Sequence, residues 1–214
     1  MNSNGVQVTD YLIRKLKNGQ SIEIQDKVAI EAPMEIRLKR TKDPMSRSVA
    51  VTMRTPGHDK DLALGFLFTE GIIKSIAEVY NVSSDQEHVT QVAVSDSTNI
   101  DLKNMDRNFY TTSSCGVCGK ASIEAIKVSP DYQNHNQITF SKALILSLTQ
   151  IVDGAQNIFD LTGGIHASSL FDASGSLISI CEDVGRHNAL DKLIGQQLIN
   201  DKLPLNEHVL LLSG

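Results

Sequence analysis

Two of the three cysteines in the chain, Cys115 and Cys118, are spaced C-x-x-C. Four hydroxyl residues precede the pair at positions 111–114, Lys120 follows it closely, and a helical pattern begins there. A thiol at the start of a helix is exposed to the partial positive charge of the helix N-terminus. Such a position, beside a cation, can lower the pKa of a thiol from about 8.5 to roughly 3.5–7.5. The stretch therefore predicts a pair of reactive thiols on a loop that runs into a helix.

Other uses of the cysteine pair remain open at this point. A structural zinc site needs four ligands, so Cys181 and a histidine would have to complete the two that the pair supplies. A purely structural pair is a further alternative. A thioredoxin-like site is disfavoured, because no βαβ pattern leads into the pair. A zinc deaminase needs H-x-E ahead of its cysteines, whereas His166 follows them and Ser168 stands where the glutamate is required.

Composition limits the class of protein. A chain of 214 residues suggests one domain, or one with a small appendage. The net charge of −5, the absence of tryptophan and the scarcity of aromatic residues argue against nucleic-acid binding. No apolar run approaches the ~18 residues of a membrane span, and no secretory signal opens the chain. An odd cysteine count does not predict a disulfide framework, so we expect a cytoplasmic protein.

The first half of the chain is predicted to be mainly β-structure. Residues 1–20 suggest a loose start, and period-2 spacing over 21–30 and 32–38 predicts a β-hairpin. Further strands are expected at 48–53, 76–83 and 88–94. Residues 59–70 predict a buried helix with one of their aspartates at the N-cap and Gly71 just past the C-terminus.

The second half alternates helices with strands. Ser141 should cap a helix over 142–153, and a second helix is expected over 189–199. Residues 159–164 suggest a loop, and strands are expected at 166–171, 177–181 and 209–212. The last of these looks buried and is followed at once by the end of the chain, which indicates truncation. The predicted class is α/β: a layered domain over 58–214 with a β-rich N-terminal portion over 1–57, integrated as one unit.

Two polar loops in this half are candidate binding segments. Gly163 and Gly164 would let the backbone approach a ligand, although they also suit a plain turn. His166, at the mouth of a predicted strand, could donate a hydrogen bond to a guanine or a phosphate, or be a core histidine.

The second loop combines Asp183, Arg186, His187 and Asn188 directly before a helix. Exposed N–H groups at a helix N-terminus, with an arginine beside them, make a candidate phosphate site. The alternative is that Asp183 caps the helix and pairs with Arg186. Cys181, in an apolar strand, is expected to be a buried small hydrophobe, and His58 an ordinary loop histidine.

Four stretches, taken together, resemble one family. They are S-S-C-G-V-C-G-K (113–120), T-G-G-I-H-A-S-S-L-F (162–171), E-D-V-G-R-H-N-A-L-D-K-L-I-G (182–195) and R-T-P-G-H-D-K-D-L-A-L-G-F-L-F-T-E-G-I-I (54–73). Each is weak or moderate alone, but in this order they closely resemble the FdhD/NarQ family. The resemblance runs from about residue 20 to the last residue. Members continue through another βα segment, so it implies that this chain lacks a C-terminal part of the family's cofactor site.

The resemblance implies a function. FdhD/NarQ proteins are accessory sulfur carriers: a cysteine desulfurase loads a persulfide, and the sulfur passes to the molybdenum cofactor (Mo-bis-molybdopterin guanine dinucleotide) before insertion into formate dehydrogenase. The resemblance also implies a fold similar to that of cytidine deaminases, without their activity, and no permanently bound cofactor. It is compatible with a homodimer.

In that role, a thiolate takes a sulfane sulfur and a second thiol releases it by forming a disulfide. Cys115 lies farther from the expected helix body than Cys118, so we predict Cys115 as the persulfide carrier and Cys118 as its partner. The two polar loops would then hold the acceptor cofactor. The competing hypothesis is a non-catalytic module that binds a guanine nucleotide or a client, with a structural or zinc-bound cysteine pair.

Overall fold

The computed structural model describes residues 5–86, 88–98 and 139–213. Its strands are β1 (Val8–Lys17), β2 (Gln20–Ala29), β3 (Ala32–Arg40), β4 (Arg47–Arg54), β5 (Val79–Gln86), β6 (Val89–Val94), β7 (His166–Phe171), β8 (Leu177–Asp183) and β9 (Val209–Leu212). Its helices are α1 (Asp59–Thr69), α3 (Lys142–Asp153), α4 (Asn157–Thr162) and α5 (Arg186–Ile199), with a short 3₁₀ turn, η1 (Ile76–Glu78).

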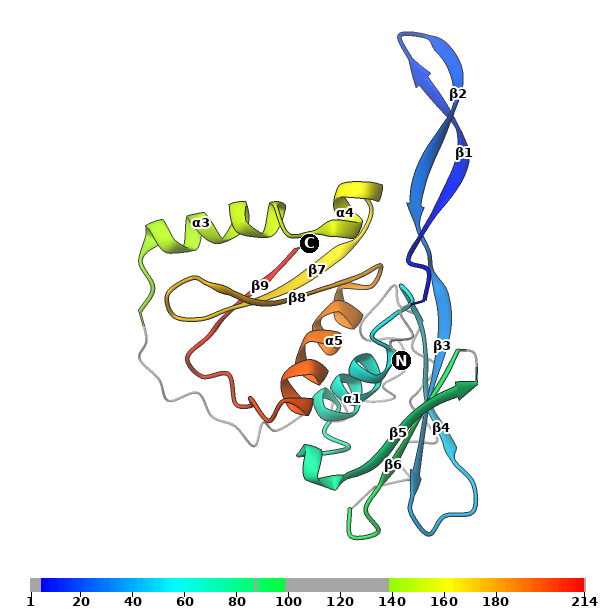
Figure 1. Cartoon of the computed structure of the whole chain (residues 1–214), viewed down its shortest axis with the longest axis vertical. Helices are drawn as coiled ribbons and strands as arrows, with labels where there is room; N and C mark the ends of the chain where they lie inside the picture. Colours follow the sequence, from blue (N-terminus) through cyan, green and yellow to red (C-terminus); the bar gives the residue numbers. More distant parts are fainter. Residues whose placement is uncertain (1–4, 87, 99–138, 214) are drawn as a thin grey trace, which may run out of the picture.

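The described part of the chain is built in layers (Figure 1). One sheet has the strand order β4-β3-β6-β5 and the other the order β8-β7-β9. Helices α1 and α5 pack on each other between the two sheets, α1 against β5 and β6, and α5 against β7 and β8. Helix α3 covers the opposite face of the β8-β7-β9 sheet, where its Leu148 and Val152 pack on Phe171. Strands β1 and β2 form a separate ribbon that projects from this body.

The crossing of α1 and α5 depends on one glycine from each helix. A side chain at Gly65 would collide with the backbone carbonyl of Asp191, and one at Gly195 with the carbonyl of Asp61. Each glycine thus faces the residue four positions before the glycine of the other helix. This reciprocal contact brings the two backbones closer than any residue with a Cβ would allow, and it fixes how the two sheets are spaced.

The N-terminal hairpin prediction was wrong in its pairing. Strand β2 pairs antiparallel with β1, over the stretch expected to be loose, whereas β3 pairs with β4 and, in parallel, with β6. The turn between β1 and β2 is Asn18–Gly19, with φ of 52° and 77°. Asn-Gly with two positive φ angles is the preferred two-residue hairpin turn, and this was the sequence signal for the pairing.

Several other boundaries differ from expectation. Helix α1 begins at Asp59, but its N-cap is His58 in the left-handed region, without a side-chain cap. Residues 157–162 form the short helix α4, where a loop was expected over 159–164. Helix α5 begins at Arg186, three residues earlier than predicted. Strand β9 lies at a sheet edge among the described strands and is half exposed, because β7 is the only one of them that pairs with it.

Other expectations are confirmed. The Ser141 hydroxyl accepts a hydrogen bond from the Leu144 N–H and caps α3. Gly71 follows α1 with a positive φ of 70°. The mixed α/β class is confirmed, whereas the likeness to cytidine deaminases stays a prediction. The division into two portions at residue 57 also stays a prediction. Strands β3 and β4, which precede residue 57, share one sheet with β5 and β6, which follow it.

Within the described residues, no helix is long and apolar enough to cross a membrane.

Candidate functional site

The structure brings the two predicted polar loops together. Strands β7 and β8 are antiparallel, and His166 is the register partner of Asp183. The loop that enters β7, with Gly163 and Gly164, therefore lies at the same end of the sheet as the loop between β8 and α5. Cys115 and Cys118 lie outside the described residues.

The loop before β7 has a clear local role. Gly163 ends α4 in the left-handed region, with φ of 65°, and its N–H donates to the carbonyl of Phe159 at 2.7 Å. Gly163 and Gly164 are exposed and His166 is partly buried. The carboxylate of Glu182 accepts hydrogen bonds from the first N–H groups of α4 at 2.9–3.2 Å, which ties α4 to β8.

Asp183 is fully buried in a network of donors. Its carboxylate lies 2.7 Å from the ammonium of Lys192, and both side chains are at most 1% exposed. The N–H groups of Thr55 and Gly185 donate to it at 3.1 and 2.8 Å, and the amide of Asn188 at 3.2 Å. The alternative in which Asp183 caps α5 and pairs with Arg186 is therefore wrong: Gly185 is the N-cap, and the cation beside Asp183 is Lys192.

The same network reaches strand β4 and the loop that follows it. The Asn188 amide donates to the carbonyl of Met53 at 2.7 Å, and Lys192 donates to the carbonyl of Thr55 at 2.8 Å. In return, the Thr55 hydroxyl accepts from the N–H of Val184 at 3.1 Å. These hydrogen bonds thus hold together two of the four motif stretches, 54–73 and 182–195, although about 130 residues separate them in sequence.

A second ion pair, in which the arginine is buried and the aspartate partly exposed, adjoins this network. Arg54, at the end of β4, is only 3% exposed and binds both carboxylate oxygens of Asp59 at 2.8 Å. Paired, two-point contacts between guanidinium and carboxylate are geometrically specific as well as strong. The pair therefore sets the direction in which the chain leaves β4 and enters α1.

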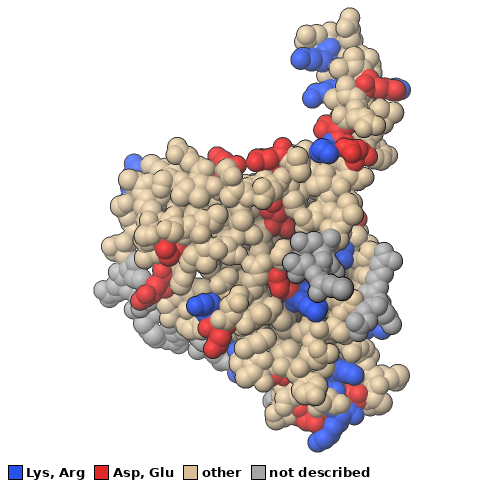
Figure 2. Space-filling model, in the orientation of Figure 1, with Lys and Arg blue, Asp and Glu red and all other residues tan. Residues whose placement is uncertain are grey.

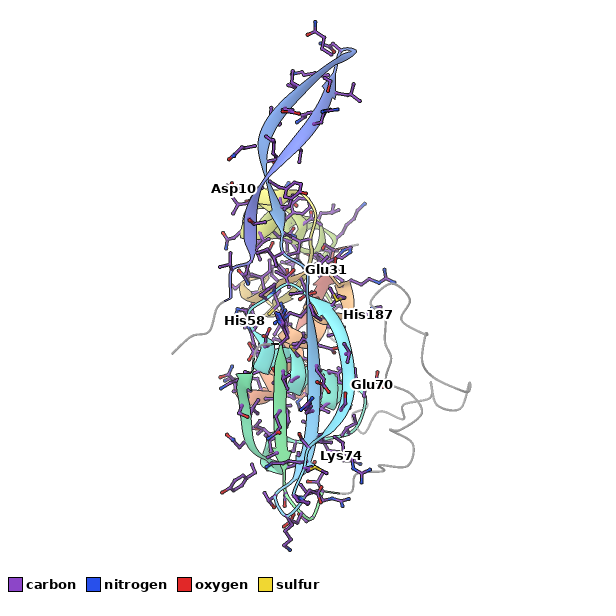
Figure 3. The ribbon with its side chains drawn as sticks, turned by 90° about the vertical axis from the view of Figure 1, so that its right-hand side faces the viewer. Asp10, Glu31, His58, Glu70, Lys74 and His187 are labelled. Atoms are coloured by element: carbon purple, nitrogen blue, oxygen red, sulfur yellow. The ribbon has the colours of Figure 1, made fainter. Side chains whose placement is uncertain are left out.

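Arg186 and His187 are the exposed members of the second polar loop. Both stand in the first turn of α5, on the solvent side of the buried Asp183 network. Figure 3 labels His187 and His58 at a similar level of the molecule, between the ribbon and the lower end of the β4-β3-β6-β5 sheet. The site thus has a buried, fixed base and an exposed rim with a cationic side chain.

His58 is a candidate that the sequence interpretation missed. It holds a φ of 57°, which is unusual for a residue other than glycine. Its Nδ1 lies 2.9 Å from a carboxylate oxygen of Asp61, which also accepts from the Gln196 amide at 3.3 Å. A carboxylate that fixes one imidazole nitrogen leaves the other in a defined direction. The signal in the sequence was an acid three residues after a histidine at a helix start.

Cys181 is 3% exposed and packs with Leu170 and Leu193 on the face of the sheet toward α5. Desolvation raises the pKa of its thiol to about 12. The burial confirms the expectation of a buried small hydrophobe. Within the described ranges, no group of three or more histidine, cysteine, aspartate or glutamate side chains is placed to hold a metal ion.

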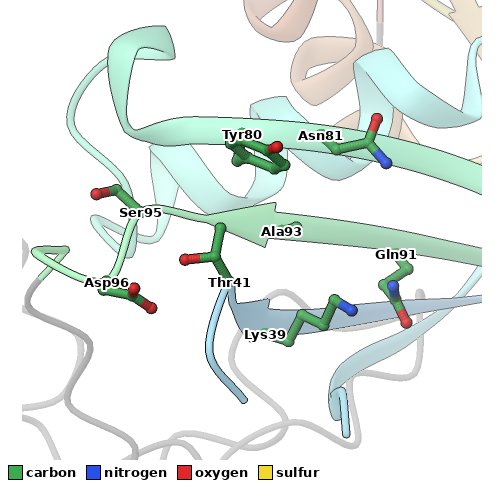
Figure 4. Close-up of a pocket in the computed structure, with 8 residues that line it drawn as sticks. All are labelled: Lys39, Thr41, Tyr80, Asn81, Gln91, Ala93, Ser95 and Asp96. Atoms are coloured by element: carbon green, nitrogen blue, oxygen red, sulfur yellow. The ribbon is translucent and has the colours of Figure 1, made fainter. Parts of the chain in front are cut away.

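A pocket of about 510 Å³ lies elsewhere, on the face of β3, β5 and β6 that points away from α1 (Figure 4). It is lined by Lys39, Thr41, Tyr80, Asn81, Gln91, Ala93, Ser95 and Asp96. None of the predicted binding residues lines it. On the face shown in Figure 2, lysine and arginine side chains are interspersed with aspartate and glutamate over the described surface.

Asp191, at the crossing of α1 and α5, should make folding stability depend on pH. Desolvation raises the pKa of this carboxyl from its ordinary value of 3.8 to about 7, helped by the charges of Glu70 and Asp183 and opposed by a hydrogen bond from the Thr69 hydroxyl. A raised carboxyl pKa means that the native state binds the extra proton. The stability from this group is therefore present below about pH 4 and is lost as pH rises to 7.

Between pH 5 and 8, we expect the wild type to lose unfolding free energy on the order of 1 kcal/mol through Asp191, a figure discounted because the side chain is only partly buried. The variant Asp191→Asn should not show this loss. Urea unfolding of both proteins at the two pH values measures it. Parallel changes in the wild type and the variant would contradict the assignment.

The profile of the FdhD/NarQ family matches residues 8–214. The sulfur carrier protein FdhD of Mycolicibacterium paratuberculosis is 41% identical over 212 residues, covering 94% of this chain and 76% of the relative. The sulfur carrier protein FdhD of Saccharolobus solfataricus is 35% identical over 210 residues, covering 98% and 77%. Among solved structures, a candidate formate dehydrogenase accessory protein from Desulfotalea psychrophila has the same fold, with a TM-score of 0.66 at 21% identity over 98% of this chain and 74% of that one.

The family profile thus spans nearly all of the chain, and relatives from a bacterium and an archaeon exceed 30% identity over most of both sequences. The four motif stretches fall inside the matched range. The chain belongs to the FdhD/NarQ family.

Proposed function

We propose that this protein is a sulfur carrier that supports the maturation of formate dehydrogenase. The observation that carries the proposal is the C-x-x-C pair within a chain 35–41% identical to proteins named sulfur carrier protein FdhD. The proposed donor is a cysteine desulfurase, the acceptor is the molybdenum cofactor Mo-bis-molybdopterin guanine dinucleotide, and the compartment is the cytoplasm.

The chemistry balances in two steps. The Cys115 thiolate attacks the terminal sulfur of the donor's persulfide; the donor's S–S bond breaks, its cysteine leaves as a thiolate, and Cys115 carries the sulfur without net oxidation. The Cys118 thiolate then attacks the Cys115 sulfur. A disulfide forms between the two cysteines, sulfide leaves toward the acceptor, and a cellular dithiol reductant must restore the pair.

The described residues suggest how the acceptor would be held. Arg186 and His187 on the exposed rim are proposed to contact its phosphates, together with the backbone at Gly163 and Gly164 and the side chain of His166. Asp183 and Asn188 are buried and bonded to protein groups. We therefore propose that these two act by positioning the rim rather than by touching the acceptor.

Loading with sulfur tests the proposal. Incubation with a cysteine desulfurase and cysteine should add one sulfur atom, about 32 Da, to the intact mass. Cys115→Ala should abolish this stable adduct, because no other cysteine is proposed to carry it. Cys181→Ala is the matched control and should load normally, since Cys181 is buried in the core. Absence of the adduct in the wild type, or its persistence in Cys115→Ala, would refute the proposed carrier.

The second candidate is a non-catalytic module that binds a guanine nucleotide or a client enzyme. The exposed Arg186 and His187 at the start of α5 favour it, because they suit an anionic ligand whatever the cysteines do. Stoichiometric zinc in the purified protein, with nucleotide binding that survives Cys115→Ala and no sulfur loading, would favour this candidate over the sulfur carrier.

A further inference from the structure

The pocket in Figure 4 is built on the outer face of the β4-β3-β6-β5 sheet, the face that points away from α1. Its floor is Ala93 in β6, which pairs in register with Lys39 in β3 on one side and with Asn81 in β5 on the other. Neighbouring strands lie about 4.8 Å apart, so the two longer side chains start about 10 Å from each other with only a methyl group between them. A small residue in the middle row thus hollows the sheet surface into a pocket of about 510 Å³.

A β-bulge in β5 brings two neighbouring side chains to this pocket. The register between β5 and β6 shifts between Val79 and Asn81, so Tyr80 is the extra residue without a partner in β6. Val79 and Val82 both pack into the core on the α1 side. In a regular strand, whose side chains alternate between the two faces, either Tyr80 or Asn81 would have to join them there. Because of the bulge, both line the pocket, and Tyr80 is 78% exposed.

The fold leaves several polar groups of this pocket unused. Among the described residues, the side chains of Asn81 and Gln91 make no hydrogen bond, and the ammonium of Lys39 makes no ion pair. The acid that lines the pocket, Asp96, is already bound by Lys42, through its N–H at 3.0 Å and its ammonium at 3.3 Å. The pocket therefore presents a cation and side-chain amides that the described part of the chain does not satisfy.

The surroundings of the pocket are basic, although the chain as a whole is acidic. The net charge of the chain is −5, but residues 37–47, which run from the pocket through the turn between β3 and β4, carry five lysines and arginines and one aspartate. Arg47 is exposed and forms no ion pair within the described ranges, whereas Arg37 pairs with Glu35 at 2.9 Å. A local excess of positive charge attracts a negatively charged ligand to this face.

The two amides are spaced for an extended peptide. Gln91 lies two residues before Ala93 in β6, so its side chain starts about 6.6 Å along the strand from the row that contains Lys39 and Asn81. An extended chain presents equivalent N–H and C=O groups every two residues, which is the same repeat. A side-chain amide both donates and accepts hydrogen bonds, so each amide can bind the backbone of such a chain.

We propose that this pocket binds a short acidic peptide segment of a partner protein in an extended conformation. The ammonium of Lys39 binds a carboxylate of the segment, and the amides of Asn81 and Gln91 bind its backbone. The ring of Tyr80 packs against the apolar part of a neighbouring side chain of the segment.

The pocket is separate from the site that is proposed to hold the sulfur acceptor. Lys39 lies seven residues along β3 from Ala32, a distance of about 23 Å in a strand. Ala32 is at the end of β3 that adjoins the acceptor site, where its carbonyl accepts a hydrogen bond from Arg54 at 3.2 Å. The proposed docking of a partner therefore does not depend on whether the cysteines carry sulfur.

Fluorescence anisotropy with the full chain and a fluorescein-labelled hexaglutamate peptide tests the proposal. Repulsion between its side chains keeps this peptide extended, and the negative net charge of the protein opposes non-specific attraction. We expect saturable binding with a dissociation constant between about 10 and 100 µM, which Lys39→Glu should weaken at least about tenfold. Gln91→Ala should weaken it about threefold, because the peptide loses a hydrogen-bond partner.

Lys142→Glu is the matched control, because it changes the net charge equally at an exposed position of α3, on the far side of the other sheet. It should leave binding unchanged, and far-UV circular dichroism and urea midpoints confirm that each variant remains folded. The absence of saturable binding up to about 1 mM, or equal losses in Lys39→Glu and Lys142→Glu, would overturn the proposal. An unchanged affinity in Gln91→Ala would overturn it whether or not Lys39→Glu folds. So would displacement by glutarate as effective as that by unlabelled hexaglutamate, since glutarate has carboxylates but no peptide groups.

Discussion

Replacing Lys192 with methionine should lower the unfolding free energy by about 3–5 kcal/mol, the range found when one partner of a buried ion pair is removed. The ammonium lies 2.7 Å from the Asp183 carboxylate, and both side chains are almost completely excluded from water. Methionine has a similar length but no charge, so the carboxylate loses its only cation among the described groups around it. Three neutral donors remain on Asp183 and offset part of the loss.

Urea unfolding followed by far-UV circular dichroism measures the change, since the chain has no tryptophan for a fluorescence signal. Lys60→Met is the matched control on the exposed side of α1 and should change stability by less than about 0.5 kcal/mol. Adding Asp183→Asn to Lys192→Met should cost less than the sum of the two single changes, because the second removes the stranded charge. Strict additivity would show that the pair is not energetically coupled.

The second large effect is expected at the crossing of α1 and α5. Gly195→Ala should destabilise the protein by about 3 kcal/mol or more, at or beyond the upper end of the range for overpacking. The added methyl group would collide with the backbone carbonyl of Asp61, which cannot turn aside as a flexible side chain would. Gly65→Ala meets the carbonyl of Asp191 in the same way and should have a comparable effect.

Gly154→Ala provides the control for backbone effects of glycine replacement. Gly154 ends α3 with a φ of −87°, and an added Cβ would lie 3.9 Å from its nearest neighbour, the Ile151 carbonyl oxygen, which is an ordinary contact. We expect its stability to change by less than about 1 kcal/mol. If Gly195→Ala lowered the unfolding free energy no more than this control does, α1 and α5 would be able to move apart to admit the methyl group. The close crossing would then not be what sets the spacing of the two sheets.

These two effects give the family motifs a physical meaning. The stretch 182–195 contributes Asp183, Lys192 and Gly195, and each of the three contacts a residue of the stretch 54–73. Only Arg186 and His187 of that stretch face solvent in the first turn of α5. Much of what resembles a binding motif in the sequence therefore holds two loops together, and the proposed contact with an acceptor falls on a small exposed part of it.

The features that the sequence determined by itself are local ones. The helix over α3 follows from apolar spacing and the Ser141 cap, and strand β7 was expected between Gly164 and the turn at residues 172–175. The C-x-x-C spacing and the order of the four motifs likewise need no tertiary structure, and they led to the family. The Asn18–Gly19 turn was also local, and it would have predicted the β1–β2 pairing.

Other features depend on contacts between distant parts of the chain. Lys192 looks like an ordinary charged position in a helix, and only the docking of α5 against the loop after β4 buries it beside Asp183. His58 looks like a loop histidine until Asp61 and Gln196, the latter from α5, fix its ring. The energy of such groups comes from desolvation and from partners more than 100 residues away. A local pattern carries no information about either, so the tertiary structure decided which polar residues are buried supports and which form the exposed rim.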